Sequence, residues 1–179
     1  MQVLETSRLI LREFRVDDAD ALGRVISDAE TMRFYVAPFD RAGVEAWIAR
    51  NRQRYELDGF GLWAMVLKST GELIGDCGLV AQNVDGIKEL EVGYHVRRDL
   101  WGQGLGTEAA RACRDYGFGE VKAERLISLI RPENFPSRRV AEKNGMRVWK
   151  EVLWHDLPHL VYAIRRDEAS ATQNAGTLL

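Results

Sequence analysis

The chain has 179 residues, of which 46% are hydrophobic and 29% charged, and its formal net charge is -2. This length predicts one domain with a core of its own, and the small net charge excludes a global field that would attract nucleic acid or an acidic membrane. No apolar run approaches the ~20 residues that span a bilayer, and the amino terminus lacks the pattern of a signal peptide.

The first half of the chain predicts one strand, two helices and then three further strands. Residues 8–14 alternate apolar and polar side chains, as a half-buried strand does. Apolar side chains at helical spacing follow Asp17 and Asp40, and both aspartates suit the amino-terminal cap of a helix. Three β-like runs then form a meander, at residues 61–67, 72–80 and 88–96.

The second half alternates helices with strands. Helices are predicted at residues 105–116 and 137–144, and strands at residues 125–130, 146–154 and 159–165. The resulting order, β-α-α-β-β-β-α-β-α-β-β, favours a mixed, mostly antiparallel α/β sheet of about seven strands with helices on both faces. This single domain is expected to occupy residues 1–166. Residues 167–179 are small and polar and are expected to form a flexible tail.

Cysteine and histidine residues show no metal-binding pattern. Cys77 and Cys113 lie inside apolar segments and form no CxxC pair, which favours a reduced, cytoplasmic protein without a disulfide framework. His155 and His159 flank the residues Asp-Leu-Pro without the HExxH context of a metal site. Both are therefore expected to be loop histidines, and no metal is expected.

Three glycines, Gly102, Gly104 and Gly106, occupy alternate positions where a helix is predicted to begin. Glycine lets the backbone approach a ligand closely, and the N–H groups of a first helical turn point towards it. Together with the helix dipole, this arrangement favours an anion, most often a phosphate. One glycine would predict only a turn, whereas three predict a phosphate site.

The surrounding residues distinguish three phosphate-bearing ligands. A Walker A loop needs a lysine after its glycines, and none follows here. Residues 104–109 match the dinucleotide pattern GxGxxA, but polar residues 97–99 separate them from the preceding strand, and the acid expected ~20 residues later is missing. A dinucleotide-binding oxidoreductase is therefore less favoured than a protein that binds the third ligand, the diphosphate of coenzyme A.

The segment ELEVGYHVRRDLWGQGLGTEA, residues 89–109, resembles the cofactor segment of the GNAT superfamily of N-acetyltransferases. Trp101 stands where this family usually has Arg or Gln, which is typical of its RimJ/RimL-like branch. ETSRLILREF at residues 5–14 and RPENFPSRRVAEKNGM at residues 131–146 resemble the opening and the NxxSxxVxEKxGF segment of the same branch. The three segments, in this order, span most of residues 5–166 and are specific in combination.

The resemblance implies acetyl-CoA as the acetyl donor, a primary amine as the acceptor and direct transfer in a ternary complex. It also implies a β-bulge in the strand Leu90–Val96 and a gap beside this strand for the pantetheine arm, and Gly93 fits such an irregularity. A backbone N–H near His95 and Val96 is the implied oxyanion donor. The residues expected to bind the cofactor are His95, Val96, Trp101, Gly102, Gln103, Gly104, Leu105, Gly106, Thr107 and Asn134.

The same resemblance implies the catalytic groups. Glu91 is the candidate base for the attacking amine, and Glu89, on the same face of the strand, is its rival. The tyrosine that usually protonates the CoA thiolate would fall at Ala141, so it is absent here. Ser137 is the substitute that the RimJ/RimL-like branch suggests, although a serine at this position also suits a helix N-cap.

The sequence therefore predicts a GNAT-fold, acetyl-CoA-dependent N-acetyltransferase of RimJ/RimL-like type. Protein N-termini and small-molecule amines both remain open as acceptors, as does a homodimer, whereas nucleic acid and membranes are not expected as partners. Two other classes remain as alternatives. One is a non-catalytic acyl-CoA-binding domain, and the other, less favoured, is the dinucleotide-binding oxidoreductase.

Overall fold

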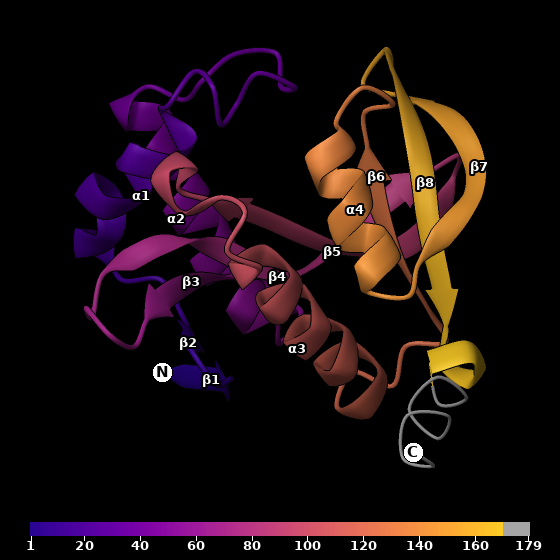
Figure 1. The fold of residues 1–179 in the computed structure, drawn as a ribbon, viewed down its shortest axis with the longest axis horizontal. Helices are drawn as coiled ribbons and strands as arrows, with labels where there is room; N and C mark the ends of the chain where they lie inside the picture. Colours follow the sequence, from indigo (N-terminus) through magenta and orange to yellow (C-terminus); the bar gives the residue numbers. More distant parts are fainter. Residues whose placement is uncertain (170–179) are drawn as a thin grey trace. The chain divides into compact units, whose positions relative to one another are not determined.

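The computed structural model describes residues 1–169, and Figure 1 labels the helices and strands of this part of the chain. Its strands are β1 (Gln2–Glu5), β2 (Leu9–Arg12), β3 (Leu62–Leu67), β4 (Leu73–Val84), β5 (Ile87–Val96), β6 (Arg125–Ile130), β7 (Arg147–Trp154) and β8 (Leu157–Arg165). Its helices are α1 (Ala19–Ile26), α2 (Arg41–Leu57), α3 (Leu105–Gly119) and α4 (Phe135–Lys143), with short 3-10 turns η1 (Val16–Asp18) and η2 (Arg98–Leu100). None of the helices within residues 1–169 combines the length and the apolar composition needed to cross a membrane.

Backbone pairing connects the strands into an eight-stranded sheet in the order β1-β2-β3-β4-β5-β6-β8-β7. β5 and β6 pair in parallel, whereas the pairs β1–β2, β2–β3, β3–β4, β6–β8 and β7–β8 are antiparallel. The predicted mixed, mostly antiparallel α/β fold is therefore confirmed. The sheet has eight strands where about seven are predicted, because Gln2–Glu5 adds an edge strand. These four residues lack a clean alternation of side chains and become a strand by pairing with β2.

Two compact units make up this fold. The first comprises residues 1–80 and 93–113, and the second comprises residues 81–92 together with the chain from Arg114 onward. The elements β4, β5 and α3 contribute residues to both units. The expectation of one domain over residues 1–166 stays a prediction, and residues 170–179 of the predicted tail lie outside the described residues.

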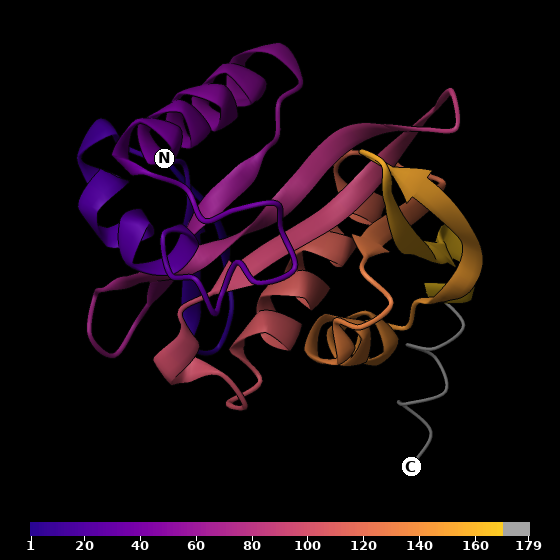
Figure 2. The ribbon, with the colours of Figure 1, turned by 90° about the horizontal axis from the view of Figure 1, so that it is seen from above.

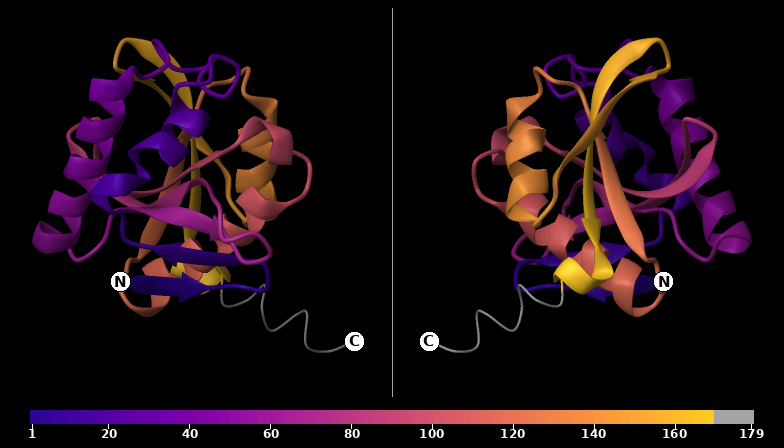
Figure 3. Two further views of the ribbon diagram at one scale, coloured as in Figure 1. Left: turned by 90° about the vertical axis from the view of Figure 1, so that its left-hand side faces the viewer. Right: turned by 90° about the vertical axis from the view of Figure 1, so that its right-hand side faces the viewer.

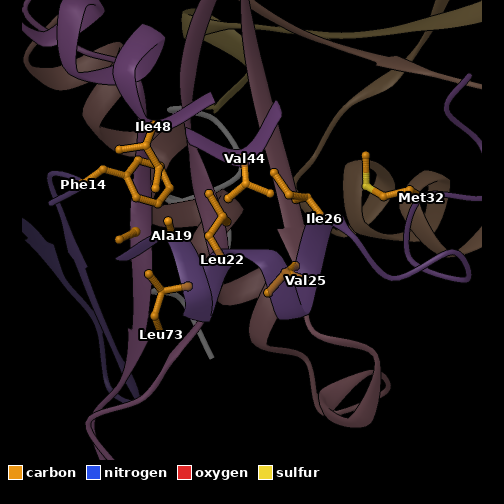
Figure 4. Close-up of a cluster of buried hydrophobic side chains, with 10 residues drawn as sticks. Phe14, Ala19, Leu22, Val25, Ile26, Met32, Val44, Ile48 and Leu73 are labelled. Carbon is orange, nitrogen blue, oxygen red and sulfur yellow. The ribbon is translucent and has the colours of Figure 1, made fainter. Parts of the chain in front are cut away.

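In the first unit, α1 and α2 pack together on one face of the strands (Figure 2). α1 presents Leu22, Val25 and Ile26 to this core, and α2 contributes Val44 and Ile48 (Figure 4). Each of these side chains is at most 4% exposed. Burying an aliphatic side chain of this size contributes about 1.5–3 kcal/mol. The helical spacing of these apolar residues therefore explains why both helices form where the sequence predicts them.

Successive residues of β4 point to opposite sides of the sheet in the first unit, as strand geometry requires. Asp76 accepts a hydrogen bond from the indole nitrogen of Trp47 on α2, at 2.8 Å. The next residue, Cys77, contacts Cys113 on α3 with 3.4 Å between the two sulfur atoms, and both cysteines are free thiols. Helices therefore cover both faces of the sheet in this unit, as predicted.

In the second unit, β6 pairs with β8, and β8 forms a hairpin with β7. His155 and Asp156 make the turn of this hairpin with φ angles of 49° and 60°. His159 lies on β8 and is only 9% exposed, so the expectation of a loop histidine is wrong at this position, because the turn needs only two residues. α4 lies alongside β8 (Figure 3), where the Arg138 Nε donates to the Tyr162 hydroxyl at 3.1 Å.

Candidate functional site

The predicted phosphate loop, residues 101–107, leads into α3 in the first unit. Gly102 and Gly104 have φ angles of 79° and 78°, in the left-handed region that strains residues with a Cβ atom. A Cβ atom placed on Gly102 would meet nothing within 4 Å, and one on Gly104 would meet only the Nη2 of Arg8 at 3.6 Å. The bare backbone of both glycines therefore borders space that a ligand can enter. Gly106, in contrast, lies inside the first turn of α3.

The loop ends at the amino terminus of a fifteen-residue helix. The amide of Glu108 donates to the Gly104 carbonyl at 3.0 Å and thereby makes the first hydrogen bond along the helix. The amides of Leu105, Gly106 and Thr107 precede it, in the part of a helix where amides have no intrahelical acceptor. These amides and the positive end of the helix dipole suit a diphosphate group.

A carboxylate fixes the shape of this loop. Glu108 accepts hydrogen bonds from the hydroxyls of Thr6 and Ser7, at 2.6 and 2.9 Å. Arg8 donates to the same carboxylate from its amide at 2.9 Å and from Nε at 2.6 Å, and its Nη1 donates to the Gln103 carbonyl at 2.9 Å. Burial raises the pKa of Glu108, but these hydrogen bonds outweigh it and lower the pKa to about 2. The turn between β1 and β2 thus clamps the glycine loop.

Trp101 folds back onto the end of β5. Its indole N–H donates to the Val96 carbonyl at 2.7 Å, and the residue remains 40% exposed. The 3-10 turn η2 lies between them and accounts for the polar residues that separate the strand from the glycines. The indole nitrogen is therefore engaged within the loop, and the exposed ring surface is the part of Trp101 that can contact a ligand.

A chain of hydrogen bonds surrounds the side chain of His95. His95 Nδ1 lies 2.7 Å from Asp76 Oδ1, and its Nε2 lies 2.7 Å from the Tyr35 hydroxyl. Asp76 is completely buried and also accepts the hydrogen bond from Trp47. The family resemblance implies a role only for the backbone of His95, so this network was not predicted. The sequence feature that could have revealed the network is Asp76, the one charged residue in the buried run Leu73–Val80. A buried charge needs a partner, so such a residue indicates a polar network.

In the second unit, β5 and β6 pair in parallel at Glu91 and Ile127. Side chains bridge the strands directly after this pair. The Ser128 hydroxyl donates to the Val92 carbonyl at 2.8 Å, and the Leu129 amide donates to the Glu91 carboxylate at 3.2 Å. The gap beside β5 stays a prediction.

β5 also departs from strict alternation. Its buried residues are Glu89, Val92 and His95, three positions apart, whereas a regular strand buries every second residue. A β-bulge produces a departure of this kind. The bulge between Leu90 and Val96 stays a prediction that this spacing supports.

The two candidate bases have different surroundings. Glu89 is only 6% exposed and accepts two hydrogen bonds from Arg125, one from Nε at 3.1 Å and one from Nη2. The Glu89 carboxylate is therefore held in an ion pair with Arg125 inside the protein. Glu91 is half-buried and accepts hydrogen bonds from the Gln82 side-chain amide, at 2.7 Å, and from the Leu129 amide. The geometry therefore favours Glu91 over Glu89.

The start of α4 carries the remaining predicted residues. Asn134 is the N-cap, because its Oδ1 accepts from the Ser137 amide at 3.2 Å. The alternative interpretation of Ser137 as the N-cap is therefore wrong, and Ser137 lies within the first turn of the helix. Ala141, where the usual tyrosine is absent, is 1% exposed. The core around it leaves little room for a larger side chain.

The predicted site residues thus fall into two groups. The first unit contains His95, Val96 and the loop from Trp101 to Thr107, and the second contains Glu91, Asn134 and Ser137. Sequence reasoning missed Arg8 and Glu108, although both lie inside segments that carry the family resemblance. Hydrogen bonds between residues 100 positions apart in the chain leave no local pattern that could reveal them.

Comparison with known proteins identifies the family. Residues 8–147 match the model of the acetyltransferase (GNAT) domain, which is more than half of the chain. The chain belongs to the GNAT family of acetyltransferases. A relative of this acetyltransferase, the Bacillus subtilis protein YkkB, is 38% identical over 161 residues, which cover 89% of this chain and 93% of YkkB.

Solved structures share the fold of this acetyltransferase. An acetyltransferase of the GNAT family from Bacillus anthracis has a TM-score of 0.79 and 26% identity, and the match covers 93% of this chain and 99% of that one. RimJ from Mycobacterium smegmatis, solved in complex with CoA-disulfide, has a TM-score of 0.70 and 24% identity, covering 94% and 89% of the two chains. The predicted family, fold and enzyme class are therefore confirmed.

Proposed function

We propose that this acetyltransferase moves the acetyl group of acetyl-CoA to a primary amine by direct transfer in a ternary complex. The observation that carries the proposal is the glycine loop, in which two left-handed glycines precede the amides of a helix N-terminus. Coenzyme A has a diphosphate that suits these amides. RimJ from Mycobacterium smegmatis, which shares the fold, was solved with CoA-disulfide, and this supports the choice of cofactor.

In this proposal, separate residues of the chain bind the cofactor, support the loop and stabilise the oxyanion. The amides of Leu105, Gly106 and Thr107 bind the diphosphate, and the Arg8–Glu108 clamp keeps the loop in its binding shape. Acetyl-CoA supplies an activated thioester with a thiolate as its leaving group. Asn134 binds the pantetheine arm, and a backbone N–H near Val96 stabilises the developing oxyanion.

Two side chains of the second unit act on protons. Glu91 takes the proton that the amine nitrogen must lose once it has attacked the thioester, and Ser137 acts as the acid for the CoA thiolate. The paired and buried state of Glu89 supports Glu91 as the base. The buried position of Ala141 supports the use of a smaller group than tyrosine as the acid.

The experiment that tests this function measures thiol release from acetyl-CoA with three amines: a peptide with a free N-terminus, an Nα-blocked lysine and a small polyamine. We expect thiol release with at least one amine and a mass gain of one acetyl group on that amine. Tight binding of acetyl-CoA without transfer to any amine would favour the non-catalytic acyl-CoA-binding domain. Binding of NAD in place of acetyl-CoA would favour the oxidoreductase.

A further inference from the structure

We propose that Tyr35, His95 and Asp76 form a proton relay that removes the first proton from a cationic amine acceptor, which docks at the Tyr35 hydroxyl. This proposal rests on the proposed function, because an ammonium ion cannot attack a thioester until it has lost a proton. It assigns a second proton-transfer route to the enzyme, separate from Glu91, and it names the acceptor class as a protonated primary amine.

The hydrogen bonds give the relay a direction. The Asp76 carboxylate can only accept, so the His95 Nδ1, 2.7 Å away, carries the hydrogen of this contact. The Nε2 of the same ring then has a lone pair, and the Tyr35 hydroxyl, 2.7 Å away, donates to it. The chain of donors therefore runs from Tyr35 through His95 to Asp76, and a proton entering at Tyr35 has a prepared path inward.

Burial makes this path effective. Asp76 is 0% exposed and His95 is 7% exposed, whereas Tyr35 is 47% exposed. Trp47 donates from Nε1 to the second oxygen of Asp76 at 2.8 Å, and its ring meets the His95 ring edge-on with 5.6 Å between centroids. Removing water from the inner groups strengthens the attraction between the carboxylate and a protonated imidazole. The outer end of the relay is the one member at the surface.

The position of Tyr35 is fixed by the segment of chain that contains it. Residues 27–40 join α1 to α2, and Met32, which is 1% exposed, anchors this segment in the core (Figure 4). Phe39 packs edge-on against the Trp47 ring at 5.3 Å between centroids. Both anchors flank Tyr35 in the chain, so its hydroxyl is held against His95. Catalytic groups need this kind of support from neighbouring residues.

One ammonium N–H bond breaks, and its proton passes to the Tyr35 oxygen while the Tyr35 hydroxyl proton passes to the His95 Nε2. The products are a neutral amine, an intact Tyr35 hydroxyl and an imidazolium that is paired with the Asp76 carboxylate. In serine hydrolases a buried aspartate stabilises an imidazolium in the same way. After the acetylated product leaves, the proton returns along the same path to solvent.

The first test separates the relay from a structural role by changing the acceptor. The variant is Tyr35→Phe, which keeps the ring against His95 and removes only the hydroxyl. Two amines are compared at pH 8: a peptide α-amine, with a pKa of about 8, and an Nα-blocked lysine, with a pKa of about 10.4. We expect kcat/KM to fall at least ~10-fold for the lysine, which is almost fully protonated, and less than ~3-fold for the peptide.

A single reactive amine also suffices for the test. The loss in Tyr35→Phe should then shrink as the assay pH rises through the pKa of that amine. Equal losses for both amines, or a loss that does not change with pH, would make Tyr35 a structural residue and overturn the relay, as would an unchanged kcat/KM. Tyr116→Phe, which removes a hydroxyl from α3, is the matched control and should keep the wild-type rate. If the wild-type enzyme acetylates no amine, the proposed function itself fails.

Asp76, at the inner end of the relay, is a positioning residue and has its own test. Asp76→Asn keeps the shape of the side chain but offers an N–H to the His95 Nδ1, so the ring changes tautomer and can no longer accept from Tyr35. We expect the same acceptor-dependent loss as in Tyr35→Phe, and no additional loss in the double variant, because both changes break one path. Fully multiplicative losses would contradict a shared relay. Thermal unfolding of each variant verifies that it is folded.

Discussion

Carboxylates serve different purposes in the two units. In the first unit, Glu108 clamps the glycine loop through Arg8, and Asp76 anchors the His95 network, so both carboxylates order other residues. In the second unit, Glu91 accepts hydrogen bonds from the amides of Gln82 and Leu129 and is the group proposed to react. The donors around a carboxylate, more than its position in a motif, therefore indicate whether it holds a structure or takes a proton.

Glu89 and Glu91 show the same contrast between a structural and a reactive carboxylate within one strand. Glu89 is buried against Arg125, and losing this partner would leave a guanidinium without its counter-charge. Glu91 lies two residues later, at the place where side chains bridge β5 and β6. Although the two glutamates have a similar sequence context, changing Glu89 is expected to lower the stability of the protein, whereas changing Glu91 is expected to lower the reaction rate.

The largest effect is expected for Glu91→Gln, which keeps the shape of the side chain and removes the proton acceptor. We expect kcat to fall by ~10²-fold, with acetyl-CoA affinity retained, and the loss should be similar for acceptors of high and low pKa. Steady-state kinetics and calorimetric titration measure the two quantities. Glu89→Gln should instead lower the melting temperature. A Glu91→Gln enzyme as fast as the wild type would leave Glu91 without a catalytic role.

A smaller effect is expected in stability for Glu108→Gln, which weakens the clamp on the glycine loop. Hydrogen bonds to a charged group contribute up to ~3 kcal/mol, so we expect a loss of about 2 kcal/mol at neutral pH. The pKa of Glu108 is lowered to about 2 from its ordinary value of 4.5, so this stability is present above pH 4.5 and is lost as the pH falls towards 2. Urea unfolding should show that the difference in free energy of unfolding between Glu108→Gln and the wild type becomes smaller as the pH falls from 4.5 towards 2. A constant difference would argue against the clamp.

The smallest effect on rate is expected for Ser137→Ala. A simple thiol has a pKa near ~8.5, so the CoA thiolate leaves without much help from an acid. We therefore expect kcat to fall by roughly tenfold, well short of the Glu91 effect. Ala141→Tyr should not raise the rate and should cost about 1–3 kcal/mol of stability, because Ala141 is 1% exposed in the core. A Ser137→Ala enzyme at full speed would leave solvent as the acid.

Local patterns in the sequence predicted most of this fold, because helices and strands depend on spacing between near neighbours. The periodicity of residues 105–116 and the alternation of residues 88–96 correspond to α3 and β5. β1 was not predicted, because its residues form a strand by pairing with β2 and show no strand pattern of their own. The glycine loop was predictable from the spacing of its glycines before a helix. The clamp between Arg8 and Glu108 depends on tertiary contacts, which no local sequence pattern indicates.

The central claim is that the glycine loop binds the diphosphate of acetyl-CoA, and a matched pair of glycine variants tests it most directly. Gly104 and Gly59 have φ angles of 78° and 79°, so valine costs similar backbone strain at both positions, but Gly59 lies at the end of α2, outside the loop. We expect Gly104→Val to lower acetyl-CoA affinity at least tenfold in calorimetry, about 1.4 kcal/mol, while Gly59→Val binds as the wild type does. Equal affinities in the two variants would contradict the assignment of this loop as the phosphate site.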